Sequence, residues 1–508
     1  MVKNSQELFE LPRAPIPPGD IKETFTADVV VVGAGTSGKA AALTAAQAGA
    51  GVIQIDKHTT FRWGGGHIAA IGSRLQKKLG IKVDKEDTIK ELMRWGGNRP
   101  DQRFYRLWTE QSGAVMDWLI GMAEKAGVET VMYQWPLPEG FDAATEYYPE
   151  YPVCHWHSQD GSRILNHSLV LQCLQNEAVK LGVDIRYRTR GVQLVRPGKG
   201  RVAGIIARNE AGDFLRFDAR NAVVLCTGDY GNNPQMMQKY APLDADIARD
   251  NNIYMFHNDN LKAAREPLNV GDGHRMAMRI GAVMEAGPPA SVAHATVGPV
   301  GNGAFLRVNI NGLRYENEDV PGQSIANSLV RQPGKKVWQI FDAKWEEELP
   351  RMGVGLGKMY VVNDILRERL RDMAVKADTI EELAQKINVP VATLRATLDR
   401  YNELAGLGKD LDYGKRPDRL TSVARPPFYA ALIQQEFLVV LGGLNANMRM
   451  QPLDAGGNVI KGLYLAGNTV GNRFAVDYPT MCPGLTHALA YLTGRIAGRN
   501  AAADSPKG

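Results

Sequence analysis

Short apolar runs of strand length alternate with helical segments near the start of the chain. Residues 28–32 read DVVVV, a continuous run that is long enough for a buried strand. The Ala-rich stretch KAAALTAAQAGA at 39–50 has the composition of a helix, and a second apolar run, GVIQI at 51–55, follows it directly. Strand, helix and strand in this order predict a βαβ unit, the building block of a parallel sheet.

The rest of the chain keeps a mixed pattern. A helix is predicted at 164–181, and apolar residues at helical spacing predict more helices within 360–405. Because the segment 286–345 is rich in Gly and turns, a separate inserted domain fits this part of the chain. From residue 437 on, short strands return and a helix at 485–499 closes the pattern, so we expect the C-terminal part to rejoin the first sheet. The other predicted strands are VDIRYRT, VQLV, VAGIIA, FLRF, NAVVLCTG, FLVVLGG, MRMQ and GLYLAG.

The composition excludes several classes of protein. With 508 residues, 44% hydrophobic and 23% charged, the chain fits a large globular protein of two to four domains and neither a disordered nor a fibrous one. The net charge of +5 is spread without a basic run, so no nucleic-acid partner is indicated. No apolar run approaches 18 residues and the first 27 are polar and Pro-rich, which predicts no membrane span and a cytoplasmic location. Four widely separated cysteines without a C-x-x-C pair predict reduced thiols and no metal centre: Cys154, Cys173, Cys226 and Cys482.

The turn between the first strand and the first helix carries the clearest chemical signal. Gly33, Gly35 and Gly38 form G-x-G-x-x-G. Glycine is needed there because the turn is tight, a pyrophosphate must approach bare backbone, and the helix must pack closely on the strand. Asp56 ends the second strand 23 residues after Gly33, near the spacing of a ribose-binding acid. The motif predicts dinucleotide binding, and Asp56 favours FAD or NAD over NADP; the alternative is a Gly-rich turn without a ligand.

Two further segments help to decide between FAD and NAD. A Gly64-Gly65-Gly66 run follows Asp56 by eight residues, and GLYLAG lies near the C-terminus. With these segments the chain resembles the superfamily of FAD-dependent fumarate reductases and 3-ketosteroid dehydrogenases, to which the succinate dehydrogenase flavoprotein is similar. The resemblance runs over nearly the whole chain and rests on DVVVVGAGTSGKAAA, NAVVLCTG, GDGHRMAMRIGA, GNGAFLRVNINGLRYENE, LRATLDRYNELAGLGKDLDYG and LGGLNANMRMQPLDAGGNVIKGLYLAGN.

The resemblance implies a fold class and a cofactor. It implies an α/β protein with a Rossmann-like FAD-binding domain built from both chain ends, residues 1–285 and 435–508, and an inserted α+β cap domain at 286–434. His67 is offset by one position from the histidine that carries flavin covalently in some relatives, so FAD is expected to be non-covalent. The positions matched to cofactor binding are Gly33, Gly35, Thr36, Ser37, Gly38, Asp56, Lys57, Gly65, Gly66, Val192, Thr227, Gly228, Gly467, Asn468, Gly484 and Leu485.

The same resemblance implies a catalytic tyrosine. Ketosteroid dehydrogenases carry a Y-P-G-P-G segment whose tyrosine hydrogen-bonds the substrate ketone, and Tyr478-Pro479 stands in the comparable place here. A phenol beside a carbonyl stabilises the enolate charge that develops in the transition state. Arg473 and His487 flank this segment, and His294 matches the histidine of a substrate-binding H-P-T segment, so these three are expected to assist. The structural alternative is a tyrosine packed in a proline turn and histidines that only support the fold.

Missing residues narrow the substrate. Fumarate reductases place a carboxylate-gripping histidine where Val439 or Val440 stands, and an arginine-bearing segment where Asn317-Glu318 is followed by DVPGQS. Fumarate is therefore not the expected substrate. We expect an oxidoreductase that transfers hydride between flavin N5 and a C=C bond conjugated to a carbonyl, on an enone, a steroid-like compound or an aromatic enoate, mainly in the direction of reduction.

Three alternatives remain open from the sequence. The first is a 3-ketosteroid or tricarballylate-type dehydrogenase that runs in the oxidative direction. The second is an NAD-dependent dehydrogenase, which leaves GLYLAG unexplained, and the third is a flavin electron carrier without turnover. In each flavin case the electron donor or acceptor is expected to lie outside the chain, because no haem motif or iron–sulfur ligand set is visible.

Overall fold

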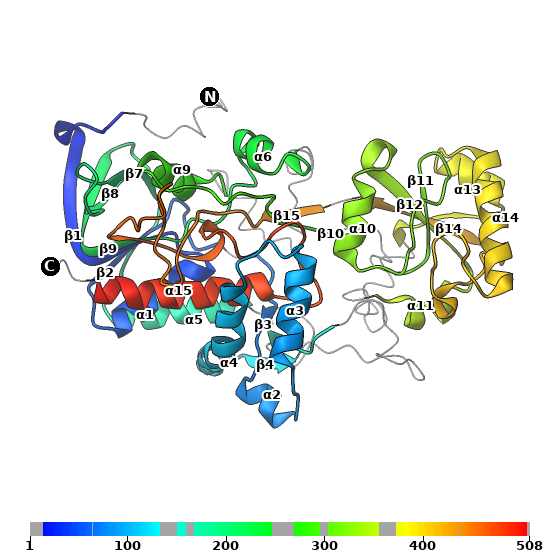
Figure 1. Ribbon diagram of the computed structural model, residues 1–508, viewed down its shortest axis with the longest axis horizontal. Coiled ribbons are helices and arrows are strands. Elements are labelled where there is room, and N and C mark those ends of the chain that lie inside the picture. Colours follow the sequence, from blue (N-terminus) through cyan, green and yellow to red (C-terminus); the bar gives the residue numbers. More distant parts are fainter. Residues whose placement is uncertain are drawn as a thin grey trace.

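Two lobes make up the protein. The computed structural model describes residues 14–62, 64–132, 150–158, 167–245, 269–294, 303–354, 372–434 and 436–504. In Figure 1 the large lobe holds both the first strand and the last helix of the described chain, and the small lobe holds the elements between β10 and β15. Within the described ranges, every helix is either too short or too polar to cross a bilayer.

A seven-stranded sheet forms the centre of the large lobe. Its order is β6-β2-β1-β9-β8-β7, and β16 pairs in parallel with β9. The strands β6, β2, β1, β9 and β16 run parallel, whereas β8 is antiparallel to both β7 and β9. The bounds are β1 Ile21–Val32, β2 Val52–Ile55, β6 Asp184–Arg186, β7 Thr189–Val195, β8 Gly204–Asn209, β9 Phe214–Leu225 and β16 Leu463–Leu465.

The parallel part of this sheet is buried because helices cover it. Val29, Val30 and Val31 of β1 have no exposed surface, as expected for a strand packed on both faces. The covering helices and the other elements of the lobe are α1 Thr36–Gln47, α2 Arg74–Lys78, α3 Lys85–Trp95, α4 Gln102–Lys125, α5 His167–Lys180, α6 Pro234–Tyr240, α9 Asp272–Arg279, α15 Leu485–Ala503, and the small sheet of β3 Ile68–Ala69, β4 Glu129–Met132 and β5 Cys154–Ser158.

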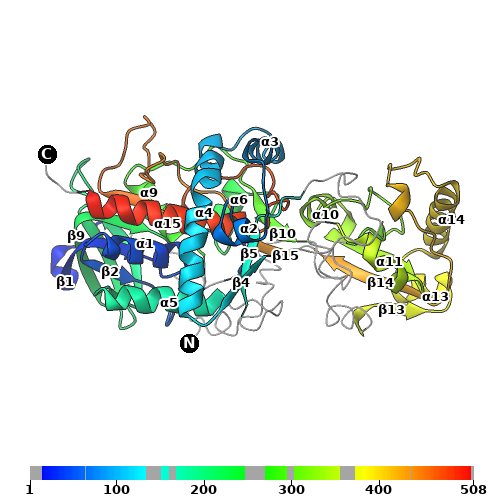
Figure 2. The same ribbon diagram turned by 90° about the horizontal axis from the view of Figure 1, so that it is seen from below.

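Helices α1 and α15 lie side by side (Figures 1 and 2). A Cβ at Gly494 or Gly498 of α15 would lie 2.5 or 2.3 Å from the carbonyl oxygen of Ser37 or Ala41 of α1, so the glycines permit this close contact. Because both contacts advance in the same direction along the chain, the helices run parallel. Helix α15 begins nine residues before Gly494, which places its N-terminus roughly 12–14 Å beyond that of α1 at a rise of about 1.5 Å per residue.

The small lobe has its own antiparallel sheet, in the order β11-β12-β14-β13, and its own core. Arg314 is held in this lobe between Glu318 at 2.8 Å and Asp410 at 2.7 Å. The antiparallel pair β10 Ser291–His294 and β15 Glu436–Val440 joins the two lobes. The elements of the small lobe are β11 Leu306–Asn309, α10 Gly322–Leu329, β12 Lys336–Asp342, α11 Trp345–Met352, β13 Val375–Ala377, α13 Ile380–Lys386, α14 Val391–Leu407 and β14 Phe428–Gln434.

The predicted fold class is confirmed: this is an α/β protein whose FAD-binding fold is built from both ends of the chain. Several element predictions differ from the structure. FLRF and NAVVL were predicted as two strands but form the single strand β9, and the first strand begins at Ile21. FLVVL forms β15, which pairs with β10 and not with the first sheet, and MRMQ is not a strand. Within 360–405, the described part contains the strand β13 as well as helices α13 and α14.

Candidate active site

The three glycines of the first turn have different structural roles. A Cβ at Gly33, whose φ is +108°, would lie 2.2 Å from the Cys226 carbonyl oxygen, and one at Gly38 would lie 2.0 Å from the Gly33 oxygen. At Gly35, the N-cap of α1, the nearest protein atom would be 3.7 Å away. Gly33 and Gly38 are therefore required by the protein itself, whereas a Cβ at Gly35 would make only an ordinary van der Waals contact, at a helix N-terminus without a side-chain cap. This is the arrangement expected where a pyrophosphate approaches the backbone.

Asp56 lies at the end of β2, beside this turn. Its carboxylate accepts hydrogen bonds from the Ala34 N–H at 2.6 Å and the His58 N–H at 2.8 Å. Burial raises the pKa of Asp56, and these two backbone bonds oppose that rise. Each carboxylate oxygen keeps a second lone pair, so the group can still accept a ribose hydroxyl. The neighbouring Lys57 forms an ion pair with Asp272 at 3.3 Å.

Two cationic side chains near Asp56 were missed by the sequence analysis. Lys39 is buried, donates to Gln175 Oε1 at 2.7 Å and lies 4.2 Å from the centre of the Phe61 ring; burial lowers its pKa to about 7. Arg62 has two buried nitrogens, Nε and Nη1, without a hydrogen-bond partner among the described residues. Its carbonyl oxygen is the atom that lies 3.7 Å from the Cβ position of Gly35. Arg62 is thus a cation with unused donors, whose backbone lies beside Gly35 and whose charge interacts with Asp56.

Other predicted cofactor positions also lie in the large lobe, on segments close to strands β7 and β9 and helix α1. Val192 is the extra residue of a bulge between β7 and β8, so its backbone falls outside the ladder. Thr227 and Gly228 follow β9, and the Thr227 hydroxyl lies 3.4 Å from that of Thr469. Gly467 has a φ of +64°, and a Cβ there would lie 2.6 Å from Ser37 Oγ at the start of α1. The segment that holds Gly467 therefore lies between the N-terminus of α1 and helix α15.

Asn468 and Arg473 meet next to this segment. The Asn468 side-chain oxygen accepts from Arg473 Nη2 at 3.1 Å, and Arg473 Nε donates to the Val470 carbonyl at 2.8 Å. Arg473 is fully buried, its Nη1 has no hydrogen-bond partner among the described residues, and burial lowers its pKa to about 10. A buried guanidinium with an unused N–H fits a polar group that is not part of the protein.

Glu285 is a further buried acid at this place that the sequence analysis did not single out. Its carboxylate accepts from the backbone N–H groups of Asn472 and, at 3.3 Å, of Gly443. Burial raises its pKa to about 7, against the opposing effect of Arg473. Glu285 therefore ties together two loops that flank the site. The signal for it in the sequence was weak, because a single Glu between apolar residues has no distinctive spacing.

The N-terminus of α15 carries the last two predicted cofactor positions, Gly484 and Leu485. Gly484, its N-cap, has a φ of +86°, and a Cβ there would lie 2.3 Å from the carbonyl carbon of His67. Leu485 is the first residue of the helix and is buried. A Cβ at Gly65 would lie 2.9 Å from the imidazole of His487, so Gly65 packs onto the first turn of α15. The backbone of Gly64 and His67 hydrogen-bonds the His487 ring, whose pKa is lowered by burial.

Tyr478 points its hydroxyl at this helix N-terminus. The Tyr478 oxygen accepts a hydrogen bond from the Thr486 N–H at 3.4 Å, and burial raises the pKa of the phenol. Its ring packs edge-on against Phe474 at 5.4 Å, and the Tyr105 ring of α4 lies 6.4 Å from Phe474. The neutral phenol keeps its own proton available for donation to a ligand, because its bond to Thr486 uses only a lone pair.

Of the four predicted catalytic residues, the structure brings two together, Arg473 and Tyr478. Tyr478 and Arg473 flank Phe474 near the start of α15, whereas His487 supports the Gly-rich loop. His294 ends β10, and its backbone pairs with Glu436 at the connection between the lobes. All four catalytic roles stay predictions.

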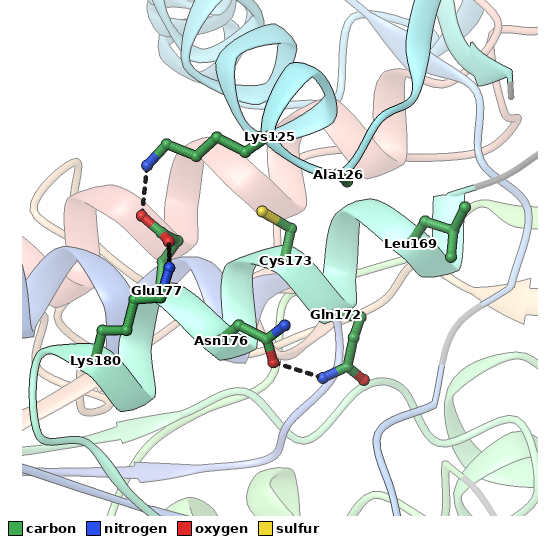
Figure 3. A pocket seen from close by; sticks show the side chains of 8 residues that line it. All are labelled: Lys125, Ala126, Leu169, Gln172, Cys173, Asn176, Glu177 and Lys180. Atoms are coloured by element: carbon green, nitrogen blue, oxygen red, sulfur yellow. Dashed lines mark hydrogen bonds and ion pairs between the residues drawn. The ribbon is translucent and has the colours of Figure 1, made fainter.

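An open hollow of about 640 Å³ lies elsewhere, between the end of α4 and helix α5 (Figure 3). Its polar side chains pair with one another: Lys125 and Lys180 with Glu177, and Gln172 with Asn176 at 2.9 Å. No group of three or more metal-ligating side chains is found in the described part of the chain. The hollow therefore offers no chemistry comparable to that of the residues around Asp56, Arg473 and Tyr478.

The Gly-rich turn, Asp56 and the parallel sheet are the features of a dinucleotide-binding α/β protein, and strands β10 and β15 join a second lobe to this fold. The family model described as FAD binding domain matches residues 28–480. The chain belongs to this FAD-binding family.

Known proteins of this kind are similar along most of their length. The vinyl phenol reductase of Lactiplantibacillus plantarum is 31% identical over 500 residues, which cover 94% of this chain and 96% of that protein. The open conformation of a flavocytochrome c3 fumarate reductase matches with a TM-score of 0.70 and 28% identity, covering 95% of this chain and 79% of that one. A 3-ketosteroid-Δ4-(5α)-dehydrogenase from Rhodococcus jostii shares the fold, with a TM-score of 0.72, 24% identity and coverage of 97% and 100%.

These findings confirm the resemblance, the cofactor and the class of reaction. The protein is an FAD-dependent oxidoreductase acting on CH–CH groups. These residues fit the cofactor: the helix N-terminus at Gly35, which has no side-chain cap, suits the pyrophosphate, and the unused donors of Arg62 and Arg473 suit polar groups of a ligand. The alternatives of an NAD-dependent dehydrogenase and of a carrier without turnover are therefore not supported.

Proposed function

We propose that the protein reduces a C=C bond conjugated to a carbonyl group, in an enone, a steroid-like compound or an aromatic enoate. FAD, when bound, supplies the hydride at N5 for the β-carbon of such a substrate. The observation that carries the proposal is the Tyr478 hydroxyl at the N-terminus of α15, 3.4 Å from the Thr486 N–H.

Tyr478 holds the oxygen of the substrate. Its hydroxyl accepts from Thr486 N–H and donates its proton to the carbonyl oxygen, where negative charge develops as hydride arrives at the β-carbon. The helix N-terminus adds a partial positive charge at the same place. Arg473, with an unused buried N–H, is proposed to polarise the same region, with His294 and His487 in assisting roles.

A second candidate substrate is a vinylphenol, because a vinyl phenol reductase matches 94% of this chain. Protonation of the terminal carbon, with loss of the phenolic proton, gives a quinone methide. This compound is an extended enone, so its oxygen fits the same place beside Tyr478. Hydride then adds to the benzylic carbon, and a proton returned to the oxygen restores the phenol.

Several finer points are part of the proposal. We propose non-covalent FAD, an electron donor outside the chain, the reductive direction, and domains at 1–285, 286–434 and 435–508. The domain limits are supported by the separate sheets of the two lobes. A cytoplasmic location is supported by four free cysteines, which suit a reducing compartment. The oxidative direction, as in a ketosteroid or tricarballylate dehydrogenase, is the rival.

The first experiment is the visible spectrum of the purified protein before and after acid precipitation. Release of FAD into the supernatant supports non-covalent binding. The enzyme is then reduced anaerobically, and flavin reoxidation is followed with cinnamate, cyclohex-2-enone, 4-vinylphenol and fumarate. We expect reoxidation by at least one of the first three and slow reoxidation by fumarate. Reoxidation by fumarate alone would contradict the proposed substrate class.

A further inference from the structure

The segment just before Tyr478 has an unusual backbone. Val476 has a φ of +64°, a left-handed conformation that is a genuine outlier for a β-branched residue. Its N–H donates to the Pro288 carbonyl at 3.1 Å, and the Asp477 N–H donates to the Ala475 carbonyl at 2.6 Å. Such strain persists only where the surroundings determine the conformation. The tight turn fixes the direction in which Asp477 and Tyr478 leave the chain.

Asp477 connects three partners from the two lobes. Its Oδ1 accepts from the backbone N–H of Tyr478 at 2.9 Å. Its carboxylate also hydrogen-bonds the side chains of Gln323 and Asn327, both on α10 of the small lobe. Gln323 is buried, and its amide lies 3.4 Å from that of Asn327. One carboxylate thus links the residue that we assign to the substrate oxygen with a helix of the other lobe.

We propose that Asp477 is a positioning residue that couples the place of the small lobe to the orientation of Tyr478. The proposal rests on the function proposed above. When α10 lies against Asp477, the carboxylate holds the Tyr478 backbone, and the phenol stays aimed at the N-terminus of α15. When α10 moves away, Tyr478 loses this constraint and the substrate oxygen loses its aligned donor.

The surroundings agree with a coupling role and not with a simple surface contact. Burial raises the pKa of Asp477 to about 6, and the nearby carboxylate of Asp244 acts in the same direction. The two amides and the Tyr478 N–H supply donors to the charged form, which has no proton of its own to donate. A buried carboxylate without these partners would be costly, so the contacts with α10 are part of what keeps Asp477 in place.

The test compares three substitutions in the FAD-loaded enzyme. Asp477→Ala removes all three bonds, and we expect single-turnover flavin reoxidation to slow by about 10²-fold with the best compound of the panel, the size of effect known for small misplacements of a reacting group. Asp477→Asn keeps an acceptor for the Tyr478 N–H and should restore most of the rate. Asp244→Asn is the matched control, because it changes a neighbouring half-buried carboxylate while leaving Asp477 and its three partners in place, and it should leave the rate unchanged.

A double-mutant cycle shows whether Asp477 acts through Tyr478. In the Tyr478→Phe background, Asp477→Ala should cost little more, because the group that it positions is already gone. Full multiplication of the two losses would overturn the proposal. Should Asp477→Ala fail to fold, Gln323→Leu with Asn327→Leu breaks the same link from the small lobe and should give the same loss in a folded protein.

Hydrogen exchange gives a readout that needs no substrate. In the FAD-loaded Asp477→Ala protein, exchange should become faster both in α10 and in 475–486, whereas Asp244→Asn should leave α10 unchanged. Unchanged exchange in α10 would overturn the coupling. If the wild type reoxidises with none of the panel compounds, the proposed function fails, and the exchange result still decides whether Asp477 links the two lobes.

Discussion

The two ends of the proposed cofactor site are built in opposite ways. At the N-terminus of α1, glycines, backbone N–H groups and Asp56 from one short stretch of chain would form the binding surface. At the N-terminus of α15, side chains from separate segments converge: Tyr105 from α4, Arg473 and Tyr478 from the C-terminal loop. The end at α1, built from backbone, suits the pyrophosphate that every FAD molecule carries. The end at α15, built from side chains, can vary with the substrate.

The largest effect on the turn at the N-terminus of α1 is expected for Gly38→Ala. A Cβ at 2.0 Å from the Gly33 carbonyl oxygen forces the turn and α1 apart, so we expect the FAD-free protein to lose about 3 kcal/mol of unfolding free energy. Gly35→Ala is the matched control, because its nearest protein atom is 3.7 Å away: stability should stay and FAD affinity should fall. Melting temperature and FAD titration measure the two effects. Equal destabilisation by both substitutions would contradict the assignment of roles.

The second end is tested by Tyr478→Phe. Loss of the hydroxyl that stabilises developing charge should lower kcat by about 10²–10³-fold. FAD binding should not change, since the ring and its contact with Phe474 remain. Stopped-flow reoxidation and FAD titration measure these quantities. Tyr105→Phe, a change at the neighbouring buried ring, should have a much smaller effect. A Tyr478→Phe enzyme with full kcat would remove the mechanism and leave the fold intact.

Arg62→Gln tests the difference between the two ends, because it removes a cation near Asp56 and leaves the residues at the N-terminus of α15 unchanged. The two unused donors belong to a guanidinium whose charge interacts with Asp56, and they suit a phosphate, so their loss should weaken FAD binding by about 1.5–3 kcal/mol, roughly 10- to 100-fold. The difference should shrink at high salt. The exposed Arg188, changed to Gln, is the control and should leave the dissociation constant as it is. Equal FAD affinity of wild type and Arg62→Gln would show that Arg62 does not contact the cofactor.

The smallest expected effect concerns Asp229, which follows Gly228. Burial raises its pKa to about 7, above the usual 3.8, so its folded form binds a proton more readily than its unfolded form. The stability that this difference supplies is present at low pH and is lost as pH rises through about 7. Asp229→Asn should therefore stabilise the protein more at pH 8 than at pH 5 by ~1 kcal/mol or more, because the loss in the wild type begins near pH 3.8 and is complete only above about 7. The same change in melting temperature at both pH values would contradict the raised pKa.

The contrast also explains what could be predicted from sequence. Gly33, Gly35, Gly38 and Asp56 were found because their spacing along the chain reflects the local geometry of one turn and two strands. The contact of Asp477 with Gln323 was out of reach, because it joins residues more than 150 positions apart. Arg62 has no periodic or motif signal, and its importance follows only from where its carbonyl and its unused donors lie.

Strand β9 was divided by the prediction for a physical reason. Its first half, paired with β8, is partly exposed and carries polar residues such as Asp218 and Arg220. Its second half, from Ala222 on, is fully buried between β1 and β16. One continuous strand thus passes from a partly exposed to a fully buried environment. The hydrophobic pattern changes at this point, and the change was interpreted as the end of one strand and the start of another.

The pairing of β10 with β15 has an evolutionary consequence. Because the chain leaves the large lobe and returns to it on two hydrogen-bonded strands, the ends of the inserted segment lie only about 5 Å apart. Insertions with neighbouring ends can be lengthened, shortened or replaced without straining their host. The small lobe can therefore be replaced as a unit by the corresponding lobe of a relative. Such chimaeric enzymes would combine an altered substrate range with an unchanged flavin domain.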